Sequence, residues 1–285
     1  MHIGIIGNGF VGSAVASGFA LHANVYVYDV DPSRTINTLE EVLGCDFVFV
    51  TVPTPMNLDE NNKIDLSIVR QVFQEASLKT TRKNIFILKS TVIPGTSLNL
   101  AREFPNLDIV FNPEFLTERS ARLDFINAAR IVLGGNPHTC ERVSRLYRQR
   151  FPHTPIVMTD ATSAEFVKYM CNCFFATKIS FMNEMKQGSD ALGLDWDKIM
   201  DGFLLDGRIG NSHLDVPGHD GYRGFGGKCF PKDINAFINF FKDRGLDPCI
   251  LESAWQKNTE VREKADWEDI AGAVTKKPRR LNEGN

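Results

Sequence analysis

Short apolar runs rich in β-branched residues alternate with segments of helical periodicity through residues 1–112. The runs are nearly continuous in hydrophobicity, which is typical of parallel strands covered on both faces. The apolar runs are residues 2–6, 23–29, 46–52, 84–90 and 107–112, and helical periodicity marks residues 10–21, 66–78 and 139–149. This rhythm predicts an α/β fold, in which crossover helices pack on a doubly wound parallel sheet of the Rossmann type.

The second half of the chain has a different pattern, because strand signals stop near residue 160. Residues 164–192 predict one long helix, capped by Asp160 or Thr162. Shorter helices are expected at 197–204 and at 233–244, with a loop at 207–230. The sequence therefore predicts a Rossmann domain at 1–159, an all-helical central domain for dimerisation and catalysis at 160–265, and a polar, basic, disordered tail at 266–285.

Composition excludes several classes of protein. The 285 residues include 32 basic and 35 acidic ones, a formal charge of −3, so no broad basic surface for nucleic acid is expected. We find no apolar run long enough to span a membrane and no secretory pattern at the N-terminus, which predicts a cytoplasmic protein without a membrane partner. The six cysteines have no framework spacing, which predicts reduced thiols, no disulfides and no metal.

A glycine motif follows the first predicted strand. The sequence GNGFVG, which begins at Gly7, fits GxGxxG in the strand, turn and helix context that binds dinucleotides. Gly7 permits the tight turn, Gly9 lets the backbone approach a pyrophosphate, and Gly12 lets helix and strand pack closely. Phe10 and Val11 begin the helix whose N-terminal amides donate to phosphates. A glycine-rich turn can also be merely structural.

Asp29 strengthens the dinucleotide interpretation. It ends the second predicted strand 17 residues after Gly12, near the separation expected for the acid that binds a ribose diol. A carboxylate there repels a 2′-phosphate, which favours NAD over NADP. Arg34 lies just beyond, where an arginine can accept that phosphate or stack on adenine.

Two further loops follow the carboxyl ends of strands, where an open α/β sheet binds its ligands. They are TVPTP at residues 51–55 and STVIPGT at residues 90–96, and prolines such as Pro53 stiffen both. The hydroxyls of Thr54 and Thr91 are placed either to face a nicotinamide or to cap the helix that follows.

Seven motifs in one order resemble the UDP-glucose/GDP-mannose dehydrogenase family over residues 1 to about 260. They are GNGFVG, TVPTP, KSTVIPGT, NPEFLTE (112–118), EFVKYMCNCFFATKISFMNE (165–184), DGRIG (206–210) and GFGGKCFPKD (224–233). The resemblance implies NAD as the cofactor. It also implies that the CH2OH group of a nucleotide sugar, UDP-glucose above all, is oxidised to a carboxylate by two hydride transfers, through an aldehyde that is not released.

By resemblance, Cys229 is the nucleophile, which would form a thiohemiacetal and then a thioester. Read from the residues alone, Cys229 lies just before a helix that begins near Pro231, where the helix dipole and a neighbouring lysine favour a thiolate. Gly226 and Gly227 would let a ligand come close. The other cysteines are interpreted as small buried apolar residues: Cys45, Cys140, Cys171, Cys173 and Cys249.

Lys168 and Asn172 are four residues apart on the long predicted helix, so both project from one face. The resemblance implies that they bind and polarise the reacting oxygen of the substrate. The alternative for Lys168 is an exposed helix lysine. A largely buried helix is predicted by nearby apolar residues: Phe166, Met170, Phe174 and Phe175.

The resemblance assigns roles to further residues. Asp233 would act with a water as general base, and Glu114 in proton transfer or thioester hydrolysis, although either carboxylate can instead be a cap or a loop residue. With Thr91, these complete the catalytic set of Cys229, Lys168, Asn172, Asp233, Glu114 and Thr91. The predicted NAD contacts are Gly7, Gly9, Phe10, Val11, Gly12, Asp29, Arg34, Pro53, Thr54, Thr91, Glu118 and Lys232. The predicted substrate contacts are Glu114, Phe115, Leu116, Glu118, Lys168, Asn172, Arg208, Phe225 and Gly226.

The resemblance also implies a partner. Arg208 would reach the substrate of a second subunit, which predicts a homodimer through the long helix. The sequence departs from the family pattern because only about 30 residues follow Trp255, too few for the second Rossmann-like domain that holds the nucleotide in the family. We expect a short enzyme, a separate chain that supplies that domain, or a smaller substrate. Arg119 replaces a common glycine, and His219 and Arg223 are placed to contact phosphates.

Two alternatives remain open. A β-hydroxyacid-type dehydrogenase has a similar length and architecture, but it performs one hydride transfer and needs no cysteine. A catalytically silent dinucleotide-binding or partner-binding protein is the other alternative. It has no chemical need for the retained set of Glu114, Lys168, Asn172, Cys229 and Asp233.

Overall fold

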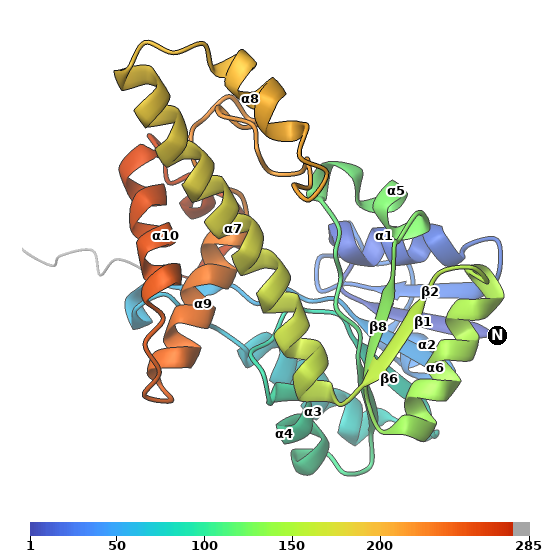
Figure 1. Ribbon diagram of the computed structural model, residues 1–285. Helices are drawn as coiled ribbons and strands as arrows, with labels where there is room; N and C mark the ends of the chain where they lie inside the picture. Colours follow the sequence, from blue (N-terminus) through green and yellow to red (C-terminus); the bar gives the residue numbers. More distant parts are fainter. Residues whose placement is uncertain (276–285) are drawn as a thin grey trace, which may run out of the picture. The chain divides into compact units, whose positions relative to one another are not determined.

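The computed structural model describes residues 1–275, which form two compact units (Figure 1). The first unit contains residues 1–54 and 65–168, and the second contains residues 55–64 and the described residues from 169 onward. This division differs from the single boundary predicted at 159/160. The long helix α7 (Ala161–Ala191) begins in the first unit and continues into the second, and residues 55–64 join the second unit.

The first unit is built on one sheet, in which seven strands from the described part of the chain run in the order β2-β1-β3-β6-β7-β8-β9. The strands are β1 (His2–Ile6), β2 (Asn24–Tyr28), β3 (Phe47–Val50), β6 (Ile85–Leu88), β7 (Asp108–Phe111), β8 (Ile131–Gly135) and β9 (Ile156–Thr159). The first five pair in parallel, which confirms the predicted α/β fold. Their carboxyl ends therefore share one edge.

The last two strands were not among the five predicted from the sequence, and one of their pairings is antiparallel. β8 pairs antiparallel to β7, with Phe111 opposite Gly134 and Val110 opposite Gly135, and β9 is parallel to β8. The connection between β7 and β8, residues 112–130, contains only a 3-10 turn and the short helix α5 (Ala121–Ile126). Parallel neighbours need a crossover that returns the chain to the starting edge, whereas a strand that follows without one runs antiparallel.

Helices cover both faces of this sheet, as the continuous hydrophobicity of the strands requires. The helices of this unit are α1 (Phe10–Phe19), α2 (Leu39–Leu43), α3 (Ser67–Lys79), α4 (Thr96–Glu103), α5 (Ala121–Ile126) and α6 (Pro137–Arg150), with one 3-10 turn at Glu118–Ser120. Successive residues of a strand point to opposite faces of the sheet and therefore pack into separate apolar cores. Val48 packs with α2, α3 and α4, whereas Phe49 packs with α1, α5 and α6.

The second unit packs α7 against two further helices, α9 (Phe230–Lys242) and α10 (Cys249–Val261), which lie side by side in Figure 1. Tyr169 of α7 stacks on Phe237 of α9 with ring centroids 4.9 Å apart, and the Ser180 hydroxyl donates to the Ala254 carbonyl of α10 at 2.7 Å. The shorter helix α8 (Trp196–Leu204) follows α7, and a 3-10 turn spans Leu58–Glu60. Asp160 accepts a hydrogen bond from the Ser163 amide at 2.9 Å, which identifies it as the cap of α7.

The second unit is not all-helical, because it contains a small sheet of β4 (Met56–Asn57), β5 (Lys63–Ile64) and β10 (Val274–Thr275). Residues 266–275, which we expected to be disordered, include a 3-10 turn at Asp266–Glu268 and this last strand. Trp267 is buried against Trp255, and the Met56 amide donates to the Ala273 carbonyl at 2.8 Å. These apolar and backbone contacts order the segment. The rest of the predicted tail, 276–285, lies outside the described residues.

The long helix also corrects the expectation of a largely buried element. Phe166, Met170 and Phe174 are exposed, with Met170 at 54% and Phe174 at 63%. They lie on the face opposite Lys168 and Asn172, which are buried. Within residues 1–275, we find no helix that combines the length and the apolar character needed to cross a membrane.

Packing between β8 and the first turn of α7 generates a prediction. A Cβ on Gly134 would lie 2.5 Å from the Ala164 Cβ and 2.8 Å from the Asp160 carbonyl oxygen. We expect Gly134→Ala to lower the free energy of unfolding by about 1–3 kcal/mol, because a packed backbone must shift. Urea denaturation measures the effect. The control is Gly202→Ala in α8, where no described atom lies within 4 Å of the added Cβ. It should stabilise the protein by about 0.5–1 kcal/mol, and equal effects of the two changes would contradict the packing argument.

Candidate active site

The glycine turn after β1 has the shape of a phosphate cradle. Gly7 has a φ of +95°, which favours glycine, and a Cβ on Gly12 would lie 2.0 Å from the Gly7 carbonyl oxygen. The Thr51 hydroxyl donates to that same carbonyl at 2.6 Å. At Gly9, in contrast, none of the described atoms lies within 4 Å of an added Cβ. The turn is therefore closed on the protein side and open at Gly9, where a pyrophosphate would approach.

Asp29 lies beside this turn, as the sequence predicts. Its Oδ2 accepts a hydrogen bond from the Asn8 amide at 2.6 Å, and its Oδ1 accepts one from the Asp31 amide at 2.9 Å. Arg34 forms an exposed ion pair with Asp31 at 3.3 Å. The carboxylate of Asp29 is thus fixed next to the glycine motif, whereas the Arg34 side chain is exposed at the surface.

The structure joins the two threonine loops. The Thr54 hydroxyl donates to the Thr91 carbonyl oxygen at 2.8 Å, and Thr54 is buried whereas Pro53 is exposed. Thr54 therefore caps no helix. It ties the end of β3 to the end of β6, at the same sheet edge as the glycine turn.

Glu114 and Lys168 form a buried ion pair. The Lys168 Nζ donates to the Glu114 Oε1 at 2.7 Å, and the Glu114 Oε2 accepts from the Leu116 amide at 2.7 Å. The Lys168 ammonium also lies 5.8 Å from the centre of the Phe115 ring. The Arg130 guanidinium lies 3.9 Å from the centre of the same ring. Helix α7 thus holds Lys168 against the loop after β7, and the alternative of an exposed lysine does not apply.

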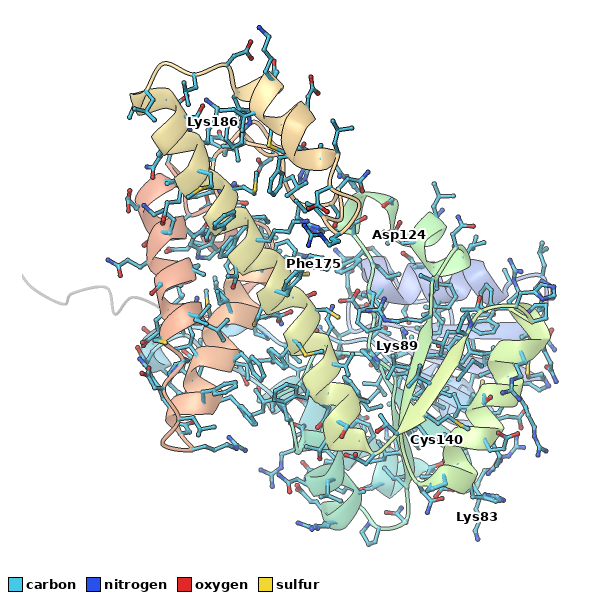
Figure 2. The ribbon with its side chains drawn as sticks, viewed as in Figure 1. Lys83, Lys89, Asp124, Cys140, Phe175 and Lys186 are labelled. Carbon is cyan, nitrogen blue, oxygen red and sulfur yellow. The ribbon has the colours of Figure 1, made fainter. Side chains whose placement is uncertain are left out.

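Lys89 is a buried polar residue that our sequence reasoning missed. It follows β6, and its Nζ donates to the Asn112 Oδ1 at 2.8 Å; the same oxygen accepts from the Tyr147 hydroxyl at 2.5 Å. Burial lowers the pKa of Lys89 to about 7, Glu114 raises it, and Lys168 lowers it further. Lys89 lies inside the first unit, while Lys83 reaches its surface (Figure 2). The signal was a lysine directly after an apolar strand.

A cavity of about 270 Å³ adjoins this cluster. Its lining includes Lys89, Asn112, Glu114, Phe115, Leu116 and Tyr147, so three predicted substrate contacts, Glu114, Phe115 and Leu116, share it with the buried lysine. Glu118 lies elsewhere, in a surface hollow of about 240 Å³ together with Phe10, Ser13 and Arg119. That hollow brings two predicted cofactor residues, Phe10 and Glu118, together at the start of α1.

Glu165 is the second polar residue that we missed. It begins the motif EFVKYMCNC and is buried. Its oxygens accept hydrogen bonds from the Gly95 amide at 2.5 Å and the Ser97 amide at 2.7 Å, so it caps the N-terminus of α4 from outside that helix. Burial raises the pKa of Glu165 to about 7, against the lowering effect of Ser97 and Gly95. The signal available in the sequence was that Glu165 lies three residues before Lys168 on the long predicted helix.

In the second unit, Cys229 is the N-cap residue of α9 and is half-buried. Its carbonyl accepts a hydrogen bond from the Asp233 amide at 2.8 Å, which begins the helical pattern. Cys229 therefore stands at the N-terminus of α9, where the helix dipole places a partial positive charge. The helix begins at Phe230, next to the start predicted near Pro231 and three residues before the range of 233–244.

Asp233 is the centre of a second buried cluster. Its Oδ2 accepts a hydrogen bond from the Asn172 amide group at 2.5 Å, and its Oδ1 forms an ion pair with the Lys232 Nζ. Asp233, Lys232 and Asn172 are all buried. The structure thus pairs Asn172 with Asp233 in one unit and Lys168 with Glu114 in the other, so each α7 side chain orders one predicted catalytic carboxylate.

One of the two glycines before Cys229 has a different cause from the one we predicted. A Cβ on Gly226 would lie 2.2 Å from the Asp266 Oδ1 and 2.3 Å from the Arg262 Nη2, so the protein itself fills that space. Gly227 has a φ of +74°, and none of the described atoms approaches it. Phe225 is buried, with its ring edge-on to Phe230 at 6.1 Å. Internal packing, not ligand access, accounts for Gly226.

Arg208 lies in an exposed loop. Its side chain is 90% exposed and pairs with Asp206 at 2.5 Å. The Lys178 Nζ, from α7, donates to the Gly210 and Ser212 carbonyls at 2.5 and 2.8 Å and so holds the same loop. Arg223, which we expected to contact phosphates, forms an ion pair with Asp190 at 2.7 Å.

All six cysteines lie in the described residues, and none of them is joined in a disulfide there. Cys45, Cys140 and Cys173 are buried, as expected of small apolar residues. Burial raises the pKa of both Cys45 and Cys140 to about 11. Cys171 is half-buried and Cys249 is exposed, which corrects the prediction for these two residues.

Comparison with known proteins agrees with this layout. Residues 34–151 match the NAD-binding domain of the UDP-glucose/GDP-mannose dehydrogenase family, and residues 162–260 match its central domain. The UDP-glucose 6-dehydrogenase of Rickettsia bellii is 36% identical over 227 residues, which are 78% of this chain and 51% of that protein. The Rickettsia typhi enzyme of the same name is 31% identical over 90% of this chain and 67% of that protein. The chain belongs to the UDP-glucose/GDP-mannose dehydrogenase family, and NAD is the cofactor of its first unit.

Solved structures show the same fold. A UDP-glucose dehydrogenase from Pyrobaculum islandicum aligns with a TM-score of 0.79 and 30% identity over 91% of this chain and 68% of that chain. A 3-hydroxyisobutyrate dehydrogenase from Mycobacterium tuberculosis aligns with a TM-score of 0.74 over 91% of this chain and 92% of its own, but at 16% identity it shows the fold alone. This chain spans about one half to two thirds of the length of the first curated relatives.

The buried amine of Lys89 generates a prediction about pH. The pKa of Lys89 falls from 10.5 to about 7 on folding, so between these values the unfolded chain binds more protons and stability rises with pH. We expect the unfolding free energy of the wild type, minus that of Lys89→Met, to rise between pH 7 and 9, by up to about 1.4 kcal/mol per pH unit. Chemical denaturation at several pH values measures this difference.

The matched control is Lys83→Met, which changes an exposed lysine near the same strand. The difference in unfolding free energy between the wild type and Lys83→Met should stay constant over the same pH range. A constant difference for Lys89→Met as well would show that burial does not perturb this amine.

Proposed function

We propose that the protein is an NAD-dependent nucleotide-sugar 6-dehydrogenase, with UDP-glucose oxidised to UDP-glucuronate as its reaction. The observation that carries the proposal is Cys229 at the N-cap of α9, next to a helix that holds Asp233 in a buried cluster with Asn172. The names of the relatives from Rickettsia bellii and Pyrobaculum islandicum support UDP-glucose over other nucleotide sugars.

The first unit supplies a cradle that fits NAD. The closed glycine turn at Gly7 and Gly12, the open approach at Gly9 and the fixed carboxylate of Asp29 match a pyrophosphate and a ribose diol. NAD, when bound, accepts one hydride in each of two successive oxidations. The loop ends tied by Thr54 and Thr91 lie at the same sheet edge and would border the nicotinamide.

Chemistry at the sugar carbon assigns the remaining roles. The CH2OH group first loses a proton and a hydride and becomes an aldehyde. The Cys229 thiolate adds to the aldehyde carbon, and the resulting thiohemiacetal loses a second hydride to give a thioester. Water then breaks the carbon–sulfur bond, which releases the carboxylate and returns the thiol. Two hydrides leave in all, so the reaction consumes two NAD molecules and one water.

Four side chains serve this sequence. The Lys168 ammonium and the Asn172 amide would stabilise negative charge on the reacting oxygen in a water-poor site. Asp233 would take the proton through a water, and Glu114 would serve thioester hydrolysis. Each carboxylate is buried and bound by one of these α7 side chains, so both are held in place before substrate arrives.

A second candidate is a β-hydroxyacid-type dehydrogenase. Its support is the full-length alignment with the 3-hydroxyisobutyrate dehydrogenase fold, which covers 92% of that chain. That reaction removes one hydride and needs no cysteine. The position of Cys229 favours the first candidate, and a silent dinucleotide-binding protein would leave the paired carboxylates without a use.

Stoichiometry separates the candidates. We expect two NADH per UDP-glucose, measured at 340 nm with limiting substrate, against little turnover of small hydroxyacids, and GDP-mannose and UDP-N-acetyl sugars complete the panel. In Cys229→Ser the overall rate should fall by at least about 100-fold, because no thioester forms. Cys249→Ser, at an exposed cysteine, is the control and should keep the rate. One NADH per substrate with an unaffected Cys229→Ser would favour the β-hydroxyacid reaction, and NAD binding without turnover would favour a silent protein.

We further propose a homodimer through α7. Met170, Phe174, Phe181 and Met185 are exposed and recur at spacings of four, seven and four, so they form one apolar stripe along the helix. A continuous exposed stripe of this kind is typical of a protein interface. Arg208 would then reach the substrate of the partner subunit, as the exposure of its side chain permits.

The apolar stripe on α7 predicts that a charged side chain introduced there disrupts the dimer. We expect Phe174→Lys to convert the dimer to a monomer in light scattering after size exclusion, because an unpaired ammonium would be buried in the interface. The control is Leu78→Lys on α3, where the leucine is also exposed but lies outside the stripe. A wild-type monomer, or a dimer that survives Phe174→Lys, would contradict the proposed interface.

A mixing test addresses the role of Arg208. If Arg208 acts on the partner's substrate, mixing inactive Arg208→Ala with inactive Cys229→Ser restores one intact site in each mixed dimer. About a quarter of the wild-type activity is then expected. If Arg208 acts within its own subunit, no site is intact and the mixture stays inactive.

A further inference from the structure

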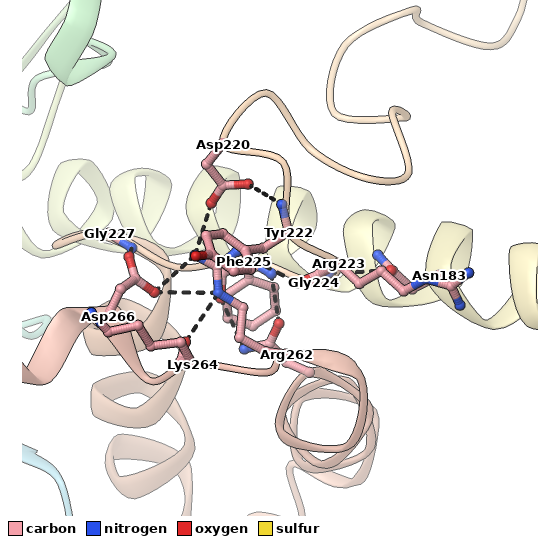
Figure 3. A network of polar contacts seen from close by, with 11 residues as sticks. Asn183, Asp220, Tyr222, Arg223, Gly224, Phe225, Gly227, Arg262, Lys264 and Asp266 are labelled. Atoms are coloured by element: carbon pink, nitrogen blue, oxygen red, sulfur yellow. Dashed lines mark hydrogen bonds and ion pairs between the residues drawn. The ribbon is translucent and has the colours of Figure 1, made fainter.

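The loop before Cys229 is held by a network of polar contacts centred on Arg262 (Figure 3). The Arg262 Nη2 donates to the Asp220 Oδ2 and to the Asp266 Oδ1, both at 2.8 Å, and its Nη1 donates to the Arg223 carbonyl at 3.4 Å. Only 2% of the Arg262 side chain is exposed. A buried guanidinium with two carboxylates and a loop carbonyl fixes the geometry of all its partners.

The same network reaches the backbone directly in front of the cysteine. The Asp266 Oδ2 accepts a hydrogen bond from the Gly227 amide at 2.9 Å. Asn258 of α10, which is fully buried, accepts from the Phe225 amide at 2.6 Å and donates to the Phe225 carbonyl at 3.0 Å. The Gly224 amide donates to the Asn183 Oδ1 of α7 at 3.1 Å. The amides of residues 224, 225 and 227 are therefore all bound by side chains from other segments.

Packing around the loop agrees with these bonds. A Cβ on Gly224 would lie 2.3 Å from the Asn258 Oδ1, and one on Gly226 would meet Arg262 and Asp266. The two glycines leave room for the side chains that bind the loop. Burial raises the pKa of Asp220, but bonds from Arg262 and the Tyr222 amide outweigh this effect, so its pKa lies below the ordinary value. Asp220 is thus ionised at neutral pH and balances the Arg262 charge.

We propose that Arg262, Asp266 and Asn258 are positioning residues for Cys229, which set the loop conformation that delivers the thiol to the N-terminus of α9. The inference rests on the proposed function for its catalytic meaning. Arg262 and Asp266 lie beyond residue 260, where the match to the family's central domain ends. The segment after α10 is accordingly part of what makes the cysteine site.

The test compares Arg262→Gln, Arg262→Lys and Asp266→Asn with a matched control, Arg244→Gln. Arg244 belongs to the same unit, and its Nη1 donates to the Phe240 carbonyl at 3.0 Å away from the loop. We expect kcat to fall by about 10- to 100-fold in Arg262→Gln, because a displaced nucleophile loses its alignment. The KM for NAD should stay within about twofold, since the NAD cradle lies in the other unit. Arg262→Lys and Asp266→Asn should fall between Arg262→Gln and the wild type, and Arg244→Gln should match the wild type.

A second readout does not depend on turnover. The rate of Cys229 alkylation by iodoacetamide, measured by peptide mass spectrometry relative to exposed Cys249, should fall about tenfold in Arg262→Gln as the thiol leaves the helix N-terminus. Hydrogen exchange of residues 220–230 should rise in the same variant and not in Arg244→Gln. Arg262→Lys and Asp266→Asn give the same comparison if Arg262→Gln fails to fold.

These readouts separate the positioning role from the proposed function. A wild type that oxidises no sugar nucleotide would overturn the function, while alkylation and exchange would still decide the positioning role. An unchanged or faster alkylation ratio in the folded variants would overturn the positioning role. Faster hydrogen exchange together with an unchanged kcat would also overturn the positioning role, because the network would then have a purely structural role.

Discussion

The parallel pairing of β1, β3, β6 and β7 is the constraint on which the first unit depends. Because parallel strands end at one edge of a sheet, this pairing brings the glycine turn, the threonine loops and the loop that carries Glu114 to one place. None of these segments is adjacent in sequence. The hydrogen bond from Thr54 to Thr91 and the one from Thr51 to Gly7 then fix the loops to one another.

Helix α7 fixes the segments at that edge of the sheet, and in doing so it buries charged side chains. Within one turn it places Glu165 on the N-terminus of α4 and Lys168 on Glu114. Removing such groups from water is unfavourable unless each is paired, and here both carboxylates accept two hydrogen bonds or an ion pair. Helix α7 then continues into the second unit, where Asn172 binds Asp233 in the same manner.

Charge burial follows the same principle around the cysteine loop. Arg262 and Asp233 are each surrounded by oppositely charged or amide partners, so polar bonds hold the loop and the start of α9 in addition to the packing of Phe225 and Phe230. A loop rich in glycine is flexible as a free chain. In this fold its flexibility is removed by side chains that enter the space left by Gly224 and Gly226.

The sequence by itself determined the α/β class, five strands, the long helix and the residues of the glycine motif, because period and spacing are local properties of the chain. It also determined the place of Cys229 before a helix. Only the tertiary structure decided the antiparallel return of β8, the small sheet that orders residues 266–275, and the exposed stripe on α7. It also decided which charges meet: Lys89 with Asn112, and Arg262 with Asp220 and Asp266. The physical reason is that these pairings join residues far apart in the chain, and their strength depends on burial, which no local pattern records.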